Sequence, residues 1–259
     1  MIAVGKVLEI WRYPVSSLGG EMCDQVDVAP SGLRGDRQYA LFDLLSGSVA
    51  APEKEARWRP ALFLKSAIDA EGAKIGFLDG SWRSLVDPQL KPMLAAHFGF
   101  EVAVGRYASF DERTLSLPQL KNRYDLAPLH LLTTTSLREL KRAALQATID
   151  RRRFRPNILV DGDAEIGFTE THWVGDTLQI DAVTAKVTEP TKRCGMTFIP
   201  QPGLEEQAEV LRTIVRQNRR SFGIYCNVTK PGRIQLGATI TRIDDNDADS
   251  HLSGIKAAD

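Results

Sequence analysis

One cysteine stands out as a residue that could do chemistry. Cys194 follows two bases in the segment Thr191-Lys192-Arg193-Cys194-Gly195. Neighbouring positive charges favour the thiolate form of a cysteine, and a following glycine leaves room for a ligand beside the backbone. A thiolate binds thiophilic metals, and it can also carry sulfur as a persulfide. A second interpretation, a small buried cysteine that happens to follow two bases, stays open on this residue type alone.

Two arginines lie in turns where they could hold an anion. Arg37 ends a glycine-rich turn, and Arg155 lies between Phe154 and Pro156 at the start of an apolar run. A guanidinium group held in a fixed turn can bind a phosphate or a polyanionic cofactor through two parallel hydrogen bonds. In contrast, Arg151 and Arg152 are expected to belong to a solvated basic surface.

Other classes of site find little support in the sequence. There is no Cys-x-x-Cys pair, no glycine-rich dinucleotide motif and no phosphate-loop lysine. The spacing of the histidines is typical neither of metal ligands nor of hydrolase triads. We interpret these four residues as core or surface histidines: His97, His130, His172 and His251.

The composition is that of an ordinary globular protein. The chain has 259 residues, 43% of them hydrophobic and 25% charged, with a formal net charge of zero. Such a balance creates no field that would recruit nucleic acid. The first residues lack the pattern of a signal peptide, and no apolar stretch has the length of a membrane span. We therefore expect a cytoplasmic protein that binds neither nucleic acid nor membrane.

Short strands separated by Gly and Pro turns dominate the predicted secondary structure. This spacing favours a barrel or sandwich over a sheet of alternating strands and helices. The predicted strands are residues 4–10, 22–28, 38–43, 153–160, 173–180, 182–187, 221–229 and 233–236.

Helices are predicted at 87–98, from Ser136 onward, and at 205–216. Ser136 is interpreted first as a helix cap, because Glu139 three residues later completes a capping box. The hydroxyl groups around Ser136 could also form an anion site at the start of that helix.

These motifs, taken in order, resemble the MOSC family, the molybdenum-cofactor sulfurase C-terminal domain, with its N-terminal β-barrel partner domain. The resemblance implies a mostly β fold with flanking helices, of the α+β class. It divides the chain into an N-terminal β-barrel-like domain (1–117), a MOSC β-barrel domain (118–243) and a flexible tail (244–259). The matching segments run in family order over nearly the whole chain: residues 13–20, 32–37, 154–160, 193–194, 222–225 and 232–237.

The resemblance also implies a molybdenum cofactor, built on molybdopterin, in a cleft between the two domains. Cys194 would be the catalytic residue and the thiolate ligand to molybdenum. Tyr225 would line the substrate side of the cofactor site. The remaining residues that the resemblance implies for cofactor binding are Ser16, Ser17, Arg37, Thr134, Ser136, Arg155 and Asn157.

Three positions depart from the amidoxime-reducing relatives in this family. Those relatives usually carry Lys-Ser at Ser16-Ser17, Asn-Ser at about Lys141-Arg142, and Gly-Asp at Gly237-Ala238. Some relatives also carry a ferredoxin-like extension with four cysteines, which this sequence does not show. The resemblance therefore predicts an oxidoreductase for small N-hydroxylated or N-oxide compounds that takes electrons from a separate iron–sulfur or flavin protein.

Two further interpretations stay open. Cys194 could take sulfur as a persulfide from a pyridoxal-phosphate-dependent cysteine desulfurase, in which case the protein is a sulfur carrier. A barrel that has lost its cofactor is the third alternative, given Ser16 and Ala238. The retention of Ser17, Arg37 and Arg155 favours the enzyme, because a sulfur carrier would not need these residues.

Overall fold

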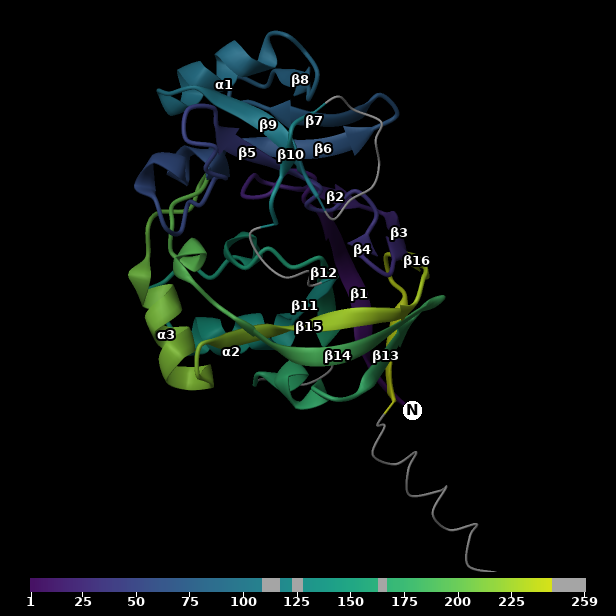
Figure 1. Cartoon of the computed structure of the whole chain (residues 1–259). Helices are drawn as coiled ribbons and strands as arrows, with labels where there is room; N and C mark the ends of the chain where they lie inside the picture. Colours follow the sequence, from purple (N-terminus) through teal and green to yellow (C-terminus); the bar gives the residue numbers. More distant parts are fainter. Residues whose placement is uncertain (109–116, 123–127, 163–166, 244–259) are drawn as a thin grey trace, which may run out of the picture.

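Seven strands close into a barrel, which lies in the lower half of Figure 1. The computed structural model describes residues 1–108, 117–122, 128–162 and 167–243. Around the barrel the order is β12, β11, β15, β14, β13, β17 and β1, and β1 pairs with β12 to close it. The bounds are β1 (Ile2–Arg12), β11 (Leu129–Thr133), β12 (Ile158–Gly162), β13 (Thr177–Ile180), β14 (Val183–Lys192), β15 (Ser221–Lys230) and β17 (Thr239–Ile243).

Strand β1 ties the start of the chain into this barrel. It pairs antiparallel with β12 on one side and with β17 on the other. Val7 and Ile10 on β1 belong to the same buried apolar cluster as Val160, Ile180 and Ile240. Each buried side chain of this size stabilises the fold by roughly 1.5–3 kcal/mol. The barrel core therefore contains residues from both sides of the domain boundary predicted after residue 117, and that boundary stays a prediction.

A second part of the molecule, in the upper half of Figure 1, packs around its own apolar core. Buried Trp58, Leu64, Ile75 and Leu94 lie in this core. Two three-stranded sheets, a helix and a 3-10 helix (η) surround it: β5 (Tyr39–Asp43), β9 (Val102–Tyr107) and β10 (Gln119–Leu120); β6 (Lys65–Asp69), β7 (Gly72–Gly76) and β8 (Trp82–Ser84); α1 (Leu90–Phe98); and η1 (Ala56–Phe63).

The remaining short strands connect the two ends of the chain. β2 (Glu21–Cys23) pairs with β1, and a small sheet joins β16 (Gly232–Gln235), β3 (Gln25–Ala29) and β4 (Gly32–Leu33). The single strand predicted at 22–28 is therefore wrong. The chain leaves the β1 ladder at Asp24 and pairs next with β16, so the run is divided between two sheets.

Two helices lie against the barrel. α2 (Thr134–Ala143) is the crossover between the parallel strands β11 and β12, and α3 (Ala208–Asn218) precedes β15. The prediction that Ser136 caps α2 is wrong: the cap is Thr133, whose Oγ1 accepts a hydrogen bond from Ser136 N at 3.0 Å. The 3-10 helices beside them are η2 (Arg151–Arg153), η3 (Thr169–Trp173) and η4 (Gly195–Thr197).

The predicted fold class, mostly β with flanking helices, is confirmed. Strand β17 was not among the predicted strands, although its Thr-Ile-Thr-Arg-Ile sequence alternates. The predicted tail at 244–259 lies outside the described residues, as does most of the stretch between Tyr107 and Pro128. Within the described ranges, none of the helices has both the length and the apolar character needed to cross a membrane.

Candidate functional site

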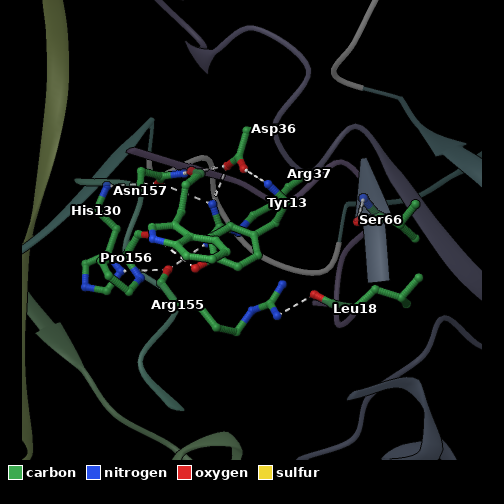
Figure 2. Close-up of polar contacts among 11 residues, drawn as sticks. Tyr13, Leu18, Asp36, Arg37, Ser66, His130, Arg155, Pro156 and Asn157 are labelled. Carbon is green, nitrogen blue, oxygen red and sulfur yellow. Dashed lines mark hydrogen bonds and ion pairs between the residues drawn. The ribbon is translucent and has the colours of Figure 1, made fainter. Parts of the chain in front are cut away.

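Asn157 is the residue on which three distant segments converge, as Figure 2 shows. Its side chain is fully buried at the entry to β12. The amide nitrogen Nδ2 donates to Trp11 O at 3.2 Å and to Asp36 Oδ2 at 3.1 Å. The amide oxygen accepts from Arg37 Nη1 and from His130 N, each at 3.2 Å. All four hydrogen-bonding positions of this amide are thus used to join the segments.

Asp36 and Arg37 form the second element of the site. Asp36 Oδ1 accepts from Tyr13 N at 2.7 Å, and Oδ2 pairs with Arg37 Nη1. Arg37 Nη2 then donates to Arg155 O at 3.1 Å. The backbone of Arg37 is left-handed, with φ of 49°, a conformation that costs free energy for any residue other than glycine. The turn is therefore held in place by contacts rather than by local preference.

Arg155 lies in a second left-handed turn, with φ of 53° directly before Pro156. Its guanidinium group stacks over the Tyr13 ring at 4.2 Å and reaches Leu18 O, as seen in Figure 2. Burial lowers the pKa of Arg155 to about 10, so the group stays charged at neutral pH. Among the described residues, the Arg155 guanidinium group contacts the Tyr13 ring and the Leu18 carbonyl oxygen and pairs with no carboxylate.

Tyr13 is the platform between the two arginines. The Arg37 guanidinium lies 4.9 Å from its ring centroid, and the ring itself is buried. Its hydroxyl group donates to Pro156 O at 3.2 Å. Burial raises the pKa of Tyr13 to about 12, against the opposing charges of Arg155 and Arg37. A neutral phenol thus holds two guanidinium groups of like charge close together through its π face.

Arg193, next to Cys194, carries a third positive charge and is buried. Its Nη1 donates to Phe154 O at 2.9 Å, and its Nε donates to Phe222 O at 2.8 Å. Nη2 contacts His130 Nε2 at 2.6 Å. Burial lowers the pKa of Arg193 to about 10, and the nearby Tyr225 and Cys194 oppose part of this shift.

Cys194 itself is exposed at the start of η4. Its carbonyl group accepts from Thr197 N at 3.2 Å and from Thr197 Oγ1 at 3.0 Å, which fixes the turn. A Cβ on the next residue, Gly195, would lie 3.4 Å from Glu53 O, so the turn faces the N-terminal part of the molecule. The preceding Lys192 donates through Nζ to Ser221 Oγ at 2.8 Å. The thiol is accessible, and the side chains of Lys192 and Arg193 before it donate hydrogen bonds to other residues.

The first glycine-rich loop lies against Arg155 through Leu18. Ser66, which is fully buried, holds this loop: its Oγ accepts from Val15 N at 3.2 Å and donates to Gly19 O at 3.1 Å. Ser17 is buried in a left-handed conformation, with φ of 69°. Ser16 is half-buried and donates from its backbone to Tyr39 O. Both predicted serines thus lie in a loop that the Arg155 guanidinium contacts.

The predicted residues at the start of α2 belong to a different network. Ser136 is fully buried, and its Oγ donates to Glu170 Oε2 at 2.6 Å. Thr133 Oγ1 donates to the same oxygen at 2.7 Å, while Thr134 Oγ1 donates to Asp161 Oδ1 at 3.3 Å. Burial raises the pKa of Glu170, and the hydroxyl donors oppose that shift. These hydroxyls already serve carboxyl groups of the protein.

We name the two sets by their chemistry. The guanidinium network comprises Tyr13, Asp36, Arg37, His130, Arg155, Asn157 and Arg193. The hydroxyl network comprises Thr133, Thr134, Ser136, Asp161 and Glu170.

The structure brings some predicted residues together and separates others. Arg37, Arg155 and Asn157 lie in the guanidinium network, and Tyr225 borders it, with its ring 5.5 Å from that of His130. Thr134 and Ser136 lie in the hydroxyl network.

Sequence reasoning missed four members of the guanidinium network as site residues: Tyr13, Asp36, His130 and Arg193. The first two lie inside the segments that carry the family resemblance, and Asp36 is directly beside Arg37. His130 gave no signal of its own. Its interpretation as a core histidine agrees with its burial and its two bonded ring nitrogens.

Comparisons with known proteins agree with the sequence interpretation. Residues 121–241 match the family model described as the MOSC domain. The mitochondrial amidoxime reducing component 2 of Bos taurus is 25% identical over 284 residues, covering 90% of this chain and 82% of the relative. The mitochondrial amidoxime-reducing component 1 of Homo sapiens matches with the same identity and coverage. The YUAD protein from Bacillus subtilis, a solved structure, is 15% identical, with a TM-score of 0.49, covering 92% of this chain and 94% of that one.

Proposed function

Since residues 121–241 are a MOSC domain, we propose that the protein is a molybdenum-cofactor-binding oxidoreductase that reduces small N-hydroxylated or N-oxide compounds. The two mammalian relatives are named as amidoxime-reducing components. The observation that carries the proposal is the charge of the guanidinium network. Arg37, Arg155 and Arg193 bring three positive charges, and within the described ranges Asp36 is the one carboxylate that pairs with them.

This charge fits the cofactor. The net charge of this network suits a phosphate monoester, because a dianion would balance the two positive charges that no carboxylate pairs with, and the Arg155 fork could bind it through two hydrogen bonds. The left-handed backbones of Ser17, Arg37 and Arg155 support a ligand role as well, since strain of this kind gathers at functional sites. Cys194 offers an exposed thiol in the turn that follows Arg193. A soft thiolate suits a metal such as molybdenum.

Each residue of the candidate site would have a separate role in holding the cofactor or the substrate. Arg37 and Arg155 would bind the phosphate and pterin, while Asn157 holds both turns. Cys194 would ligate the metal. Tyr225 would line the substrate side. When bound, the cofactor would supply two-electron chemistry that removes oxygen from nitrogen.

The loop around Ser17 would add hydrogen bonds to the cofactor. Ser17 and Ser16 are the donors that we assign there. Ser136 would reach a cofactor after breaking its hydrogen bond with Glu170, so we assign neither Ser136 nor Thr134 a direct contact.

A separate iron–sulfur or flavin protein would supply the electrons. Three cysteines, Cys23, Cys194 and Cys226, are spread along the whole chain, a spacing that does not suit an iron–sulfur cluster. The location in the cytoplasm stays a prediction, and the two mammalian relatives are named as mitochondrial.

Substitution of Cys194 tests the proposal. Wild type, Cys194→Ala and, as a matched thiol control, Cys23→Ser should be purified from a host that makes the cofactor. We expect wild type and Cys23→Ser to reduce an aryl amidoxime with reduced methyl viologen as donor, and Cys194→Ala to be inactive while still folded. Retained reduction in cofactor-loaded Cys194→Ala would contradict the proposal.

The sulfur carrier remains the second candidate, and the exposed thiol of Cys194 is what favours it. A cysteine desulfurase with cysteine as sulfur donor would then add the mass of one sulfur atom to the Cys194 peptide. Such a gain in wild type, together with absence of molybdenum and of amidoxime reduction, would replace the oxidoreductase by the carrier.

A further inference from the structure

His130 lies at the centre of the guanidinium network, and the proposed function gives it no role. It belongs to β11, whose neighbours are β12 and β15, and 3% of it is exposed. Directly opposite on β15 is Tyr225, with the two rings in an edge-to-face arrangement. A polar ring buried in a sheet costs free energy unless both of its nitrogens are bonded.

Both ring nitrogens are bonded, and the chemistry of the partners fixes the tautomer. Nδ1 lies 3.2 Å from Arg155 O, and Nε2 lies 2.6 Å from Arg193 Nη2. A carbonyl oxygen accepts and a guanidinium group donates, so Nδ1 carries the proton and Nε2 accepts. Burial, with the charge of Arg193, holds the pKa of His130 well below its usual range. The ring is therefore neutral and can serve both partners.

The two partners place the two halves of the candidate site. The Arg155 carbonyl, held by His130 and by Arg37 Nη2, orients the left-handed turn from which the Arg155 side chain reaches Leu18. Arg193 is the residue before Cys194, and its guanidinium group ties that turn to Phe154 and Phe222. His130 is the ring that bonds to both.

Gly223 leaves room for this arrangement. Its φ is +82°, and a Cβ at this position would lie 2.7 Å from His130 Nε2 and 3.3 Å from Arg193 Nη2. Any side chain there would push into the contact between the two residues. The absence of a side chain at Gly223 thus lets His130 and Arg193 meet beside β15.

We propose that His130 is a positioning residue that couples the Cys194 turn to the Arg155 turn through its two ring nitrogens. The proposal rests on the proposed function in one respect: the coupled turns are those expected to hold the metal and the phosphate. It concerns contacts between the protein's own residues, so the experiment can be done on cofactor-free protein.

Three substitutions separate the two contacts. His130→Asn keeps an amide donor near the position of Nδ1 and loses the acceptor for Arg193. His130→Gln keeps an acceptor near the position of Nε2 and loses the donor to Arg155 O. His130→Phe keeps the ring and loses both. His97→Gln is the matched control, because His97 bonds to Pro60 O at 2.9 Å in the N-terminal part.

The main readout is hydrogen–deuterium exchange of cofactor-free protein, followed in the peptides 150–158 and 190–199. Loss of one buried hydrogen bond should accelerate exchange about tenfold in the turn it held. We expect His130→Gln to accelerate 150–158, His130→Asn to accelerate 190–199, and His130→Phe to accelerate both. His97→Gln should change neither peptide.

A uniform rise in exchange through β11 and β12 that follows the loss of melting temperature would overturn the proposal, as would unchanged exchange in all three variants. A second arm measures molybdenum retained by protein from a cofactor-making host, where His130→Phe should lose about tenfold. If wild type holds no molybdenum, the proposed function fails. The exchange experiment still decides on His130 in that case.

Discussion

The guanidinium network and the hydroxyl network both contain residues predicted to bind the cofactor, yet they differ in charge. The first contains three guanidinium groups, and among the described residues Asp36 is the one carboxylate that pairs with them. In the second, Glu170 Oε2 already accepts hydrogen bonds from Thr133 and Ser136. We propose that a helix start with several hydroxyls does not bind an anion when carboxyl groups of the protein already accept their hydrogen bonds. Four substitution experiments and one composition measurement test this contrast.

The largest expected effect on stability is that of Asn157→Ala in the guanidinium network. The substitution removes four contacts of a buried amide and leaves Asp36 and the His130 backbone with fewer partners. We expect the free energy of unfolding to fall by about 3 kcal/mol, measured by urea denaturation. Asn218→Ala is the control, since Asn218 makes two side-chain contacts and is half-buried. Equal losses in the two variants would contradict a central role for Asn157.

Ser136→Ala should have a smaller effect, confined to stability. Removal of Oγ leaves Glu170 Oε2 with one hydroxyl donor in place of two. The free energy of unfolding is expected to fall by about 1–2 kcal/mol. The exposed Ser46→Ala variant serves as the control. An unchanged stability would show that the hydroxyl network does not depend on this contact.

The smallest effects concern pH, and the two networks should respond in opposite directions. His130 faces Arg193, Arg37, Tyr225 and the Arg155 carbonyl, and burial lowers its pKa well below 6.5. As pH falls below 6.5 the unfolded chain takes up a proton on this residue and the folded chain does not, so stability declines. His130→Asn should flatten this acid-side slope. The measurement is urea denaturation between about pH 5 and pH 8.

Glu170 should give the opposite slope. Burial raises its pKa above 4.5, so the folded chain keeps a proton that the unfolded chain loses as pH rises through 4.5. Stability attributable to this residue therefore declines as pH rises towards the folded pKa. Glu170→Gln should remove the decline while keeping one amide donor and one acceptor. A slope unchanged by this substitution would argue against a protonated carboxyl group in the folded state.

Local patterns in the sequence predicted the three α-helices and several of the longer strands. Alternating or apolar runs marked β1, β5, β14 and β15, because each of these strands buries one or both faces. The position of the α2 cap could not be read in the same way. Thr133 and Ser136 both suit a cap by residue type, and the end of β11 decides between them.

The site was predicted in part, and the missing part depends on tertiary structure. Arg37 and Arg155 could be predicted from the sequence because each lies in a turn that Gly or Pro marks. Their contacts with Tyr13, Asn157 and His130 join distant parts of the chain: Arg37 and Asn157, for example, are 120 positions apart. Left-handed backbones at two arginines likewise follow from those contacts, since arginine has no local preference for them.

The most direct test of the account is the molybdenum and pterin content of wild type, Arg155→Leu and Ser136→Ala, each purified from a cofactor-making host. We predict near-stoichiometric metal in wild type, a similar content in Ser136→Ala, and a loss of about tenfold or more in Arg155→Leu, because a charged hydrogen-bond donor to the phosphate is removed. Arg155→Lys should fall between them, since it keeps the charge and loses the fork. Equal metal in Arg155→Leu and wild type, or a loss confined to Ser136→Ala, would contradict the assignment of the cofactor to the guanidinium network.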